Sequence, residues 1–264
     1  MSQIRSPAVA GMFYPAEPDQ LRGMIESMLA EAHPEAAIEV PPKAIIVPHA
    51  GYIYSGPVAA SAYTGLTAVK EVITRVVLLG PAHRVPVRGL VLPASDAFAT
   101  PLGIVSIDQE AVTKISALPQ VRVFDDAHTL EHSLEVHLPF LQTVLSDFQL
   151  VPLVVGEATA EEVAQVLELL WGGPETLIVV SSDLSHYHDY QTAQQMDSAT
   201  SDAIEHLAFE NIRFDQACGR VPISGLLLTA RKHGMHGRTI DLRNSGDTAG
   251  PRDQVVGYGA YVFH

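Results

Sequence analysis

Three uninterrupted apolar runs dominate the hydrophobic pattern of the chain: AIIV at 44–47, VVLL at 76–79 and LIVV at 177–180. Such runs, rich in Val and Ile and without polar alternation, are typical of strands in a parallel sheet that is covered on both faces. We predict strands at Lys43–Val47, Arg75–Leu79, Gly89–Leu92, Leu150–Val155, Thr176–Val180 and Val255–Phe263.

Segments with helical spacing alternate with these runs. In the segment 18–33, Leu21, Ile25 and Leu29 recur every fourth residue behind Asp19, a suitable N-cap residue, which predicts a surface helix with one buried face. Further helices are predicted at Pro57–Tyr63, Glu110–Ala117, Glu131–Leu145, Ala160–Leu170, Gln191–Ala208 and Pro222–His233. The alternation of strands and helices indicates an α/β fold.

Length and composition favour a single domain over residues 1–264. Hydrophobic residues make up 47% of the 264 residues, which is enough for a large core. The formal net charge of −14 argues against nucleic acid or an anionic membrane as a partner, because Lys and Arg drive phosphate binding. No apolar run approaches the roughly 20 residues that cross a bilayer, and no signal peptide is evident, so we expect a cytoplasmic protein.

Each of the three apolar runs leads into a histidine: His49 in IIVPHAGY, His83 in LLGPAHR and His186 in VVSSDLSH. In open α/β sheets the ligand crevice lies beyond the carboxyl ends of the strands, so these side chains are expected to converge there. They are candidates for a metal or catalytic site. The alternative for His49 and His83 is a histidine that caps a strand end by bonding to backbone.

The third strand end, SSDLSHYHD at 181–189, is dense in groups that bind metals or transfer protons. A histidine near its ordinary pKa serves as acid or base, and a neighbouring carboxylate can orient it. Asp183 and Asp189 are candidates for that orienting role beside His186. The alternative is a polar loop whose Ser and Asp side chains cap the next helix.

Cys218 is the one cysteine of the chain, which excludes an internal disulfide. It precedes Gly219 and the predicted helix at Pro222–His233. The positive end of a helix dipole would favour its thiolate, the form that binds metals. The alternative is a small buried hydrophobic side chain.

The segment EHSLEVH at 131–137 lacks the i, i+4 histidine pair of a zinc-protease helix. On the predicted helix, His132 and Glu135 would share one face and would line the pocket or orient a ligand. A polar patch on the helix surface is the alternative.

Six segments resemble the Memo family, in the family's order and over nearly the whole chain. They are PAVAGMFYP at 7–15, PHAGYIYSGPVAASAY at 48–63, LLGPAHRVP at 78–86, EHSLEVHLPF at 131–140, VVSSDLSHY at 179–187 and CGRVPISGLL at 218–227. Prokaryotic members are often called AmmeMemoRadiSam system protein B, which implies an AMMECR-type protein and a radical SAM protein as partners. The resemblance also implies a three-layer α/β/α sandwich like that of LigB-type class III extradiol dioxygenases, a phosphorylase/hydrolase-like fold.

The resemblance further implies that His49, His83 and Cys218 hold a metal ion, with His186 as the acid/base residue and Asp183 beside it. The dioxygenases hold iron with two histidines and a carboxylate. A cysteine in place of the carboxylate shifts the preference toward copper or zinc. From the resemblance and this substitution together we expect iron or copper, with zinc as a third option.

Two functions follow from these expectations. One is a metal-dependent oxidoreductase that acts on an unidentified small molecule, with His186, Asp183 and His132 in its pocket. The other is a non-catalytic metal- or ligand-binding protein that works with the radical SAM protein. A zinc-dependent hydrolase is a weaker third option.

Overall fold

The computed structural model describes residues 3–32 and 40–264, so the end of the first predicted helix at His33 lies outside the described residues. The strands are β1 (Ile4–Arg5), β2 (Ala44–Val47), β3 (Arg75–Pro81), β4 (Leu90–Leu92), β5 (Ala97–Thr100), β6 (Gly103–Ser106), β7 (Val121–Val123), β8 (Gln149–Val155), β9 (Thr176–Ser181), β10 (His186–His188), β11 (Gly237–Asn244) and β12 (Val255–Phe263). The helices are α1 (Pro18–Glu31), α2 (Tyr52–Tyr63), α3 (Gln109–Ile115), α4 (Asp126–Thr129), α5 (Leu138–Val144), α6 (Ala160–Leu170), α7 (Tyr190–Glu205) and α8 (Arg220–Lys232).

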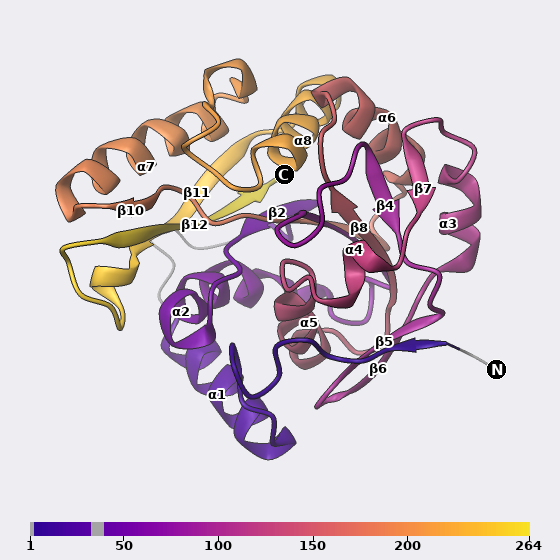
Figure 1. Cartoon of the computed structure of the whole chain (residues 1–264), viewed down its shortest axis with the longest axis horizontal. Helices are drawn as coiled ribbons and strands as arrows, with labels where there is room; N and C mark the ends of the chain where they lie inside the picture. Colours follow the sequence, from indigo (N-terminus) through magenta and orange to yellow (C-terminus); the bar gives the residue numbers. More distant parts are fainter. Residues whose placement is uncertain (1–2, 33–39) are drawn as a thin grey trace.

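A large mixed sheet forms the centre of the molecule (Figure 1). Its strands follow the order β10, β12, β2, β9, β3, β8, β4 and β7, and β11 pairs with β12. The three strands that lead into the candidate histidines, β2, β9 and β3, are adjacent and parallel, with β9 in the middle. Their carboxyl ends therefore meet at one edge of the sheet.

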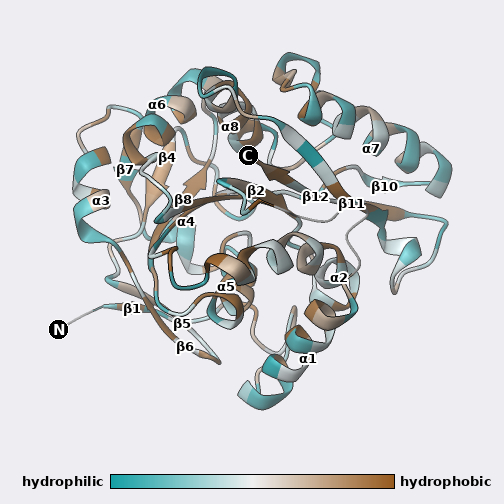
Figure 2. Ribbon diagram, turned by 180° about the vertical axis from the view of Figure 1, so that it is seen from behind, coloured by the Kyte–Doolittle hydropathy of each residue, from teal (hydrophilic) through white to brown (hydrophobic). Residues whose placement is uncertain are grey.

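Helices cover both faces of this sheet. Successive side chains of a strand point to opposite faces, and in the central strands both sets are apolar, so each face needs a covering layer. Ile45 and Val47 of β2 join the hydrophobic cluster that includes residues of α1 and α2. Ala44 and Ile46 join the cluster on the other face, which includes residues of α6 and α8. Figure 2 shows apolar central strands between helices whose outer faces are hydrophilic. The predicted three-layer α/β/α arrangement is confirmed.

The predicted strands are confirmed, but several predicted helix limits are wrong. Helix α2 begins at Tyr52 rather than at Pro57, which lies inside the helix. The Tyr52 amide donates to the Phe13 carbonyl at 2.8 Å, so the N-terminal segment holds the first turn in place. The N-cap position of α1 is Glu17, whose side chain makes no capping hydrogen bond, rather than Asp19. Pro18 occupies the first helical position, where its fixed φ suits a helix start.

The prediction of a continuous helix over Glu131–Leu145 is also wrong. Residues 131–134 form no helix, a 3-10 turn spans Glu135–His137, and α5 begins only at Leu138. The Glu131 carboxylate accepts the amides of His132 and Ser133, both at 3.0 Å, which bends the chain away from helical geometry.

Strands β1, β5, β6, β7, β10 and β11 were not predicted. The first five have only two to four residues, and the sequence of β11, GRTIDLRN, carries charged residues along the sheet edge. A smaller sheet, β1-β5-β6, lies beside the main one. No helix within the described ranges 3–32 and 40–264 has the length and apolar character needed to cross a membrane.

Candidate metal centre

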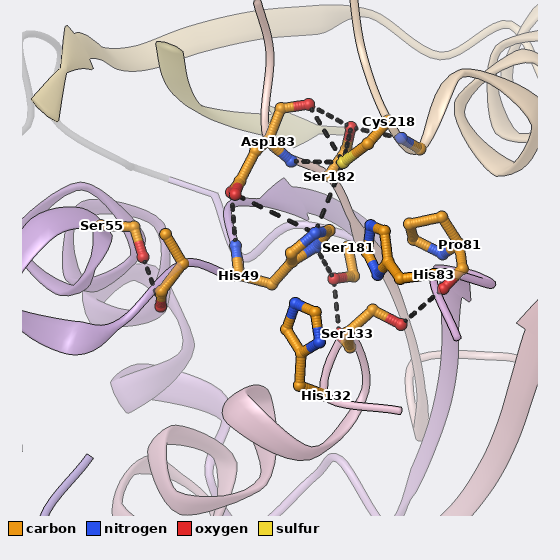
Figure 3. Close-up of polar contacts among 12 residues, drawn as sticks. His49, Ser55, Pro81, His83, His132, Ser133, Ser181, Ser182, Asp183 and Cys218 are labelled. Carbon is orange, nitrogen blue, oxygen red and sulfur yellow. Dashed lines mark hydrogen bonds and ion pairs between the residues drawn. The ribbon is translucent and has the colours of Figure 1, made fainter. Parts of the chain in front are cut away.

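The ends of β2, β9 and β3 bring candidate residues from distant parts of the sequence to one place. His49 follows β2, Asp183 follows β9 and His83 follows β3, and these three strands are parallel neighbours. The rings of His49 and His83 lie 5.1 Å apart between centroids, with their planes at 69°. Figure 3 shows both rings beside Asp183 and Cys218.

His49, His83 and His132 form a three-histidine cluster. One ring nitrogen of each residue lies within 4.8 Å of those of the other two. The His83 and His132 rings stack, with centroids 4.8 Å apart and an interplanar angle of 16°. Sequence reasoning places His132 along the pocket, and the structure puts it directly against the two strand-end histidines.

Glu131 orients the His83 side of the cluster. Its carboxylate lies 2.9 Å from His83 Nδ1 and accepts the His83 amide at 2.6 Å. Burial opposes ionisation of Glu131, but hydrogen bonds from the His83 ring and from the His83 and Ser133 amides outweigh it and lower the pKa to about 2. The carboxylate is therefore charged at neutral pH and holds the proton of His83 on Nδ1, which leaves Nε2 free as a metal ligand.

Ser181 and His137 form the corresponding contacts on the His49 side. His49 Nδ1 lies 2.6 Å from Ser181 Oγ, and His137 Nε2 lies 2.8 Å from the same oxygen. Sequence reasoning missed both residues, as it missed Glu131. Ser181 lies in the polar segment 181–189 and His137 lies in EHSLEVH, but neither residue is set apart from its neighbours there by a local signal, although both fall in the segments that resemble the Memo family.

Cys218 lies next to His49 rather than between the histidines. Its Sγ is 3.4 Å from His49 Nε2 and 3.3 Å from the Asp183 amide nitrogen. Among the described residues, Cys218 is not part of the three-histidine cluster. The expectation of a thiolate is wrong for the metal-free site, because burial and the nearby Asp183 charge raise the pKa of Cys218 to about 12.

Asp183 lies on the same side of His49. One carboxylate oxygen accepts the His49 amide at 2.7 Å, and the other is 4.0 Å from His49 Nε2. Burial raises the pKa of Asp183 to about 6, although the His49 amide and nearby histidines favour its ionised form. His186 is partly buried, and its Nδ1 lies 2.8 Å from the Leu184 carbonyl oxygen. That bond fixes the proton on Nδ1 and leaves His186 Nε2 able to accept one.

Glu135 does not share a face with His132, which corrects the helical prediction. Its fully buried carboxylate pairs with Arg5 Nη1 at 2.8 Å and accepts the Tyr14 hydroxyl at 2.7 Å. These bonds fix the N-terminal segment, and the Phe13 ring of that segment packs 4.8 Å from the His132 ring. Glu135 thus anchors one wall of the site from outside the cluster. Asp189 caps α7 instead, accepting the Gln191 and Thr192 amides.

The residues present suit a metal ion. His132 Nδ1 is buried and has no hydrogen-bond partner among the described residues, with Glu131 Oε1 3.5 Å away. Burial lowers the pKa of His132 to about 4 and that of His49 well below its ordinary value, so both rings are neutral at pH 7. Neutral imidazoles with free nitrogens are good ligands for first-row transition metals.

The 3.4 Å between Cys218 Sγ and His49 Nε2 also suits a shared metal ion. Bond lengths of about 2.1 Å to nitrogen and 2.3 Å to sulfur, at a tetrahedral angle, separate two ligand atoms by roughly 3.6 Å. His49 therefore has a ligand group on each side: the other two histidines, and Cys218.

Comparison with known proteins places the whole chain in one family. The model of the Memo family, described as Memo-like protein, matches residues 5–262. A MEMO1 family protein of Aquifex aeolicus is 38% identical over 99% of both chains. A second, from Sulfolobus acidocaldarius, is 37% identical over 97% of both. The crystal structure of an uncharacterized protein from Escherichia coli K12 has a TM-score of 0.47 and 12% identity, covering 83% of this chain and 98% of its own. By its sequence, the chain belongs to the Memo family.

Proposed function

We propose that this protein holds one transition-metal ion at the ends of β2 and β3, with His49 and His83 as ligands and Cys218 as the third. The observation that carries the proposal is the convergence of three histidine nitrogens within 4.8 Å, two of them from the ends of the strands on either side of β9. Cys218 completes the set from the side of His49, at a distance that fits coordination to one ion.

His132 is the competing third ligand. Its ring belongs to the cluster, and its buried Nδ1 lacks a hydrogen bond among the described residues. The two arrangements differ in chemistry, because a thiolate favours softer ions such as copper and three imidazoles suit zinc or iron.

We propose iron or copper as the native ion, which would supply electron transfer and oxygen chemistry to a small-molecule substrate. Asp183 and His186 would move protons beside it. Asp183, with a pKa of about 6, can both hold and release a proton near neutral pH. His186 keeps one proton on Nδ1 at the Leu184 carbonyl and offers Nε2 as the base.

Metal analysis of protein purified anaerobically without added metal tests the centre. Wild type is compared with His83→Ala, Cys218→Ser and His132→Ala, and with His206→Ala as a control at an exposed histidine on the end of α7. We expect about one iron or copper per chain in wild type and in the control, and loss in His83→Ala and Cys218→Ser. Equal, negligible metal in all five proteins, and no uptake of added Fe²⁺ or Cu⁺ by wild type, would refute the metal centre.

Catalysis needs its own test. Oxygen consumption by the metal-loaded protein with a panel of small phenols and thiols should require His186, and a His186→Ala variant that retains its metal should lose it. If the loaded wild type neither consumes oxygen nor changes its redox state, the oxidoreductase proposal fails while the metal centre stands.

A second proposal is a binding protein in the cytoplasm that works with an AMMECR-type protein and a radical SAM protein. It is supported by two largely exposed side chains that are next to residues of the site in the sequence: Met12, at 72% exposure, precedes Phe13, and Tyr187, at 71%, follows His186. A complex that forms equally well with His186→Ala would favour this function. Zinc-dependent hydrolysis, which three histidines would suit, would be shown by ester cleavage that chelators abolish.

A further inference from the structure

A chain of hydrogen-bonded side chains runs from the proposed metal centre into the apolar core. It consists of Ser181 on β9, His137 in the 3-10 turn and Tyr63 at the end of α2, none of them more than 1% exposed. His137 Nδ1 lies 3.0 Å from the Tyr63 hydroxyl, and His137 Nε2 lies 2.8 Å from Ser181 Oγ. Polar groups in such surroundings destabilise a fold unless each one is paired, so the position of every proton matters.

The proton positions follow from Ser181. Its hydroxyl has one hydrogen and lies 2.6 Å from the Ser133 carbonyl oxygen, which can only accept. The hydrogen of Ser181 is therefore used there. The contacts of Ser181 Oγ with His49 Nδ1 at 2.6 Å and with His137 Nε2 at 2.8 Å must then be donated by the two imidazoles.

This arrangement leaves one consistent state for each ring. His49 carries its proton on Nδ1, so Nε2 presents a lone pair toward the site, where Cys218 Sγ lies 3.4 Å away. His137 carries its proton on Nε2, so its Nδ1 accepts the Tyr63 hydroxyl. All the contacts in the chain are satisfied at once, with no proton left over and none missing.

We propose that Ser181, supported by His137 and Tyr63, is a positioning residue that fixes the His49 tautomer and so reserves Nε2 for the metal ion. The part of this inference that concerns metal binding rests on the proposed metal centre. Without the Ser181 hydroxyl, His49 Nδ1 loses its acceptor, and the ring is free to carry the proton on Nε2, where it would block coordination.

The two strand-end histidines are consequently not equivalent ligands. His83 donates to the charged carboxylate of Glu131 at 2.9 Å, which increases the electron density on its Nε2. His49 donates to a neutral hydroxyl that is itself fixed by a carbonyl. The centre therefore combines one strongly donating and one weakly donating imidazole. The bond from the metal ion to His49 is consequently the more easily broken of the two metal–histidine bonds.

Nitrogen-15 NMR of histidine-labelled, metal-free protein tests the tautomer directly. The His49 signals are identified by their absence in His49→Ala. We expect wild-type His49 to show a protonated Nδ1 and an unprotonated Nε2 at pH 7.5, and Ser181→Ala to show a mixture of the two tautomers. A wild-type ring protonated on Nε2 would overturn the inference, even if the Ser181 variant could not be folded.

Binding of Co²⁺, followed by its visible absorption, provides the second readout. Ser181→Ala should bind Co²⁺ about 10- to 100-fold more weakly, the usual effect of losing a residue that orients a ligand. The matched control is Ser201→Ala. Ser201 lies on α7, and its buried hydroxyl is 2.7 Å from the Tyr261 hydroxyl, outside the chain of contacts around His49. This variant should bind Co²⁺ like wild type and show the same spectrum.

The outcomes separate this inference from the proposed function. If wild type shows the expected tautomer and binds no Co²⁺, the metal centre fails and the positioning by Ser181 stands. If wild type binds Co²⁺ and Ser181→Ala binds it equally, with an unchanged His49 tautomer, the positioning role is refuted and the metal centre stands.

Discussion

Raising the pH should tighten metal binding about tenfold per pH unit between pH 7 and 9, because Cys218 must lose a proton to become a ligand. Burial and the Asp183 charge raise the pKa of the metal-free thiol to about 12. At pH 7 about one thiol in 10⁵ is then ionised, which costs roughly 7 kcal/mol of the binding free energy at about 1.4 kcal/mol per pH unit. The cost falls as the pH rises toward the pKa.

Protonation of His49 and His132 adds no comparable pH dependence to metal binding between pH 7 and 9. Burial lowers the pKa of His132 to about 4 and that of His49 well below its ordinary value, so both rings are neutral at pH 7 before the metal arrives. Metal affinity that depends on imidazole alone would therefore be flat from pH 7 to 9.

The assay is competition for Co²⁺ against a chelator of known pH dependence, at half-unit steps from pH 7 to 9. Wild type should give a slope of minus one in log Kd against pH, and Cys218→Ser a slope near zero with weaker binding throughout. A flat profile for wild type would refute thiolate ligation and assign the metal ion to His49, His83 and His132.

Three further predictions concern the residues that support the site. Glu131→Gln should lower the free energy of unfolding by roughly 3 kcal/mol at pH 7 in urea titrations; because the folded pKa of about 2 lies below the ordinary value of 4.5, this stabilisation should disappear as the pH falls from 4.5 to 2. A difference that persists at pH 2 would contradict that origin. Gly219→Ala should cost about 1–3 kcal/mol in thermal denaturation, since its Cβ would lie 2.6 Å from the Ser181 carbonyl oxygen, and an unchanged Tm would argue against this close approach. Glu135→Ala should cost about 3–5 kcal/mol by leaving the Arg5 guanidinium buried without its partner, and a double variant with Arg5→Ala should be no less stable than the single one.

The apolar runs were sufficient to predict the strands that carry the site and the edge at which they end. Strands β2, β3 and β9 carry uninterrupted apolar runs that are buried on both faces, which is a strong signal in the hydrophobic pattern. Their spatial order, with β9 between the other two, depends on long-range packing that no local pattern encodes.

The surroundings of the ligands could not be predicted in the same way. Glu131 replaces a helical turn by its own hydrogen bonds to backbone, so helical spacing misplaces Glu135 relative to His132. Ser181 is indistinguishable from any small residue at a strand end until His137 is seen to approach it from another segment. The thiol pKa of Cys218 depends on its burial and on the nearby Asp183, and both follow only from the folded chain.

The position of β9 also determines when the centre can form during synthesis of the chain. β2 and β3 are made first, yet they do not pair with each other, and β9 inserts between them from more than ninety residues further along the sequence. A nascent chain that ends before β9 has both histidine-bearing strands but lacks the strand that sets their spacing. Assembly of the site is therefore a late folding event that requires a non-local, parallel strand insertion, the kind of step that is slow and leaves strand edges open in the meantime.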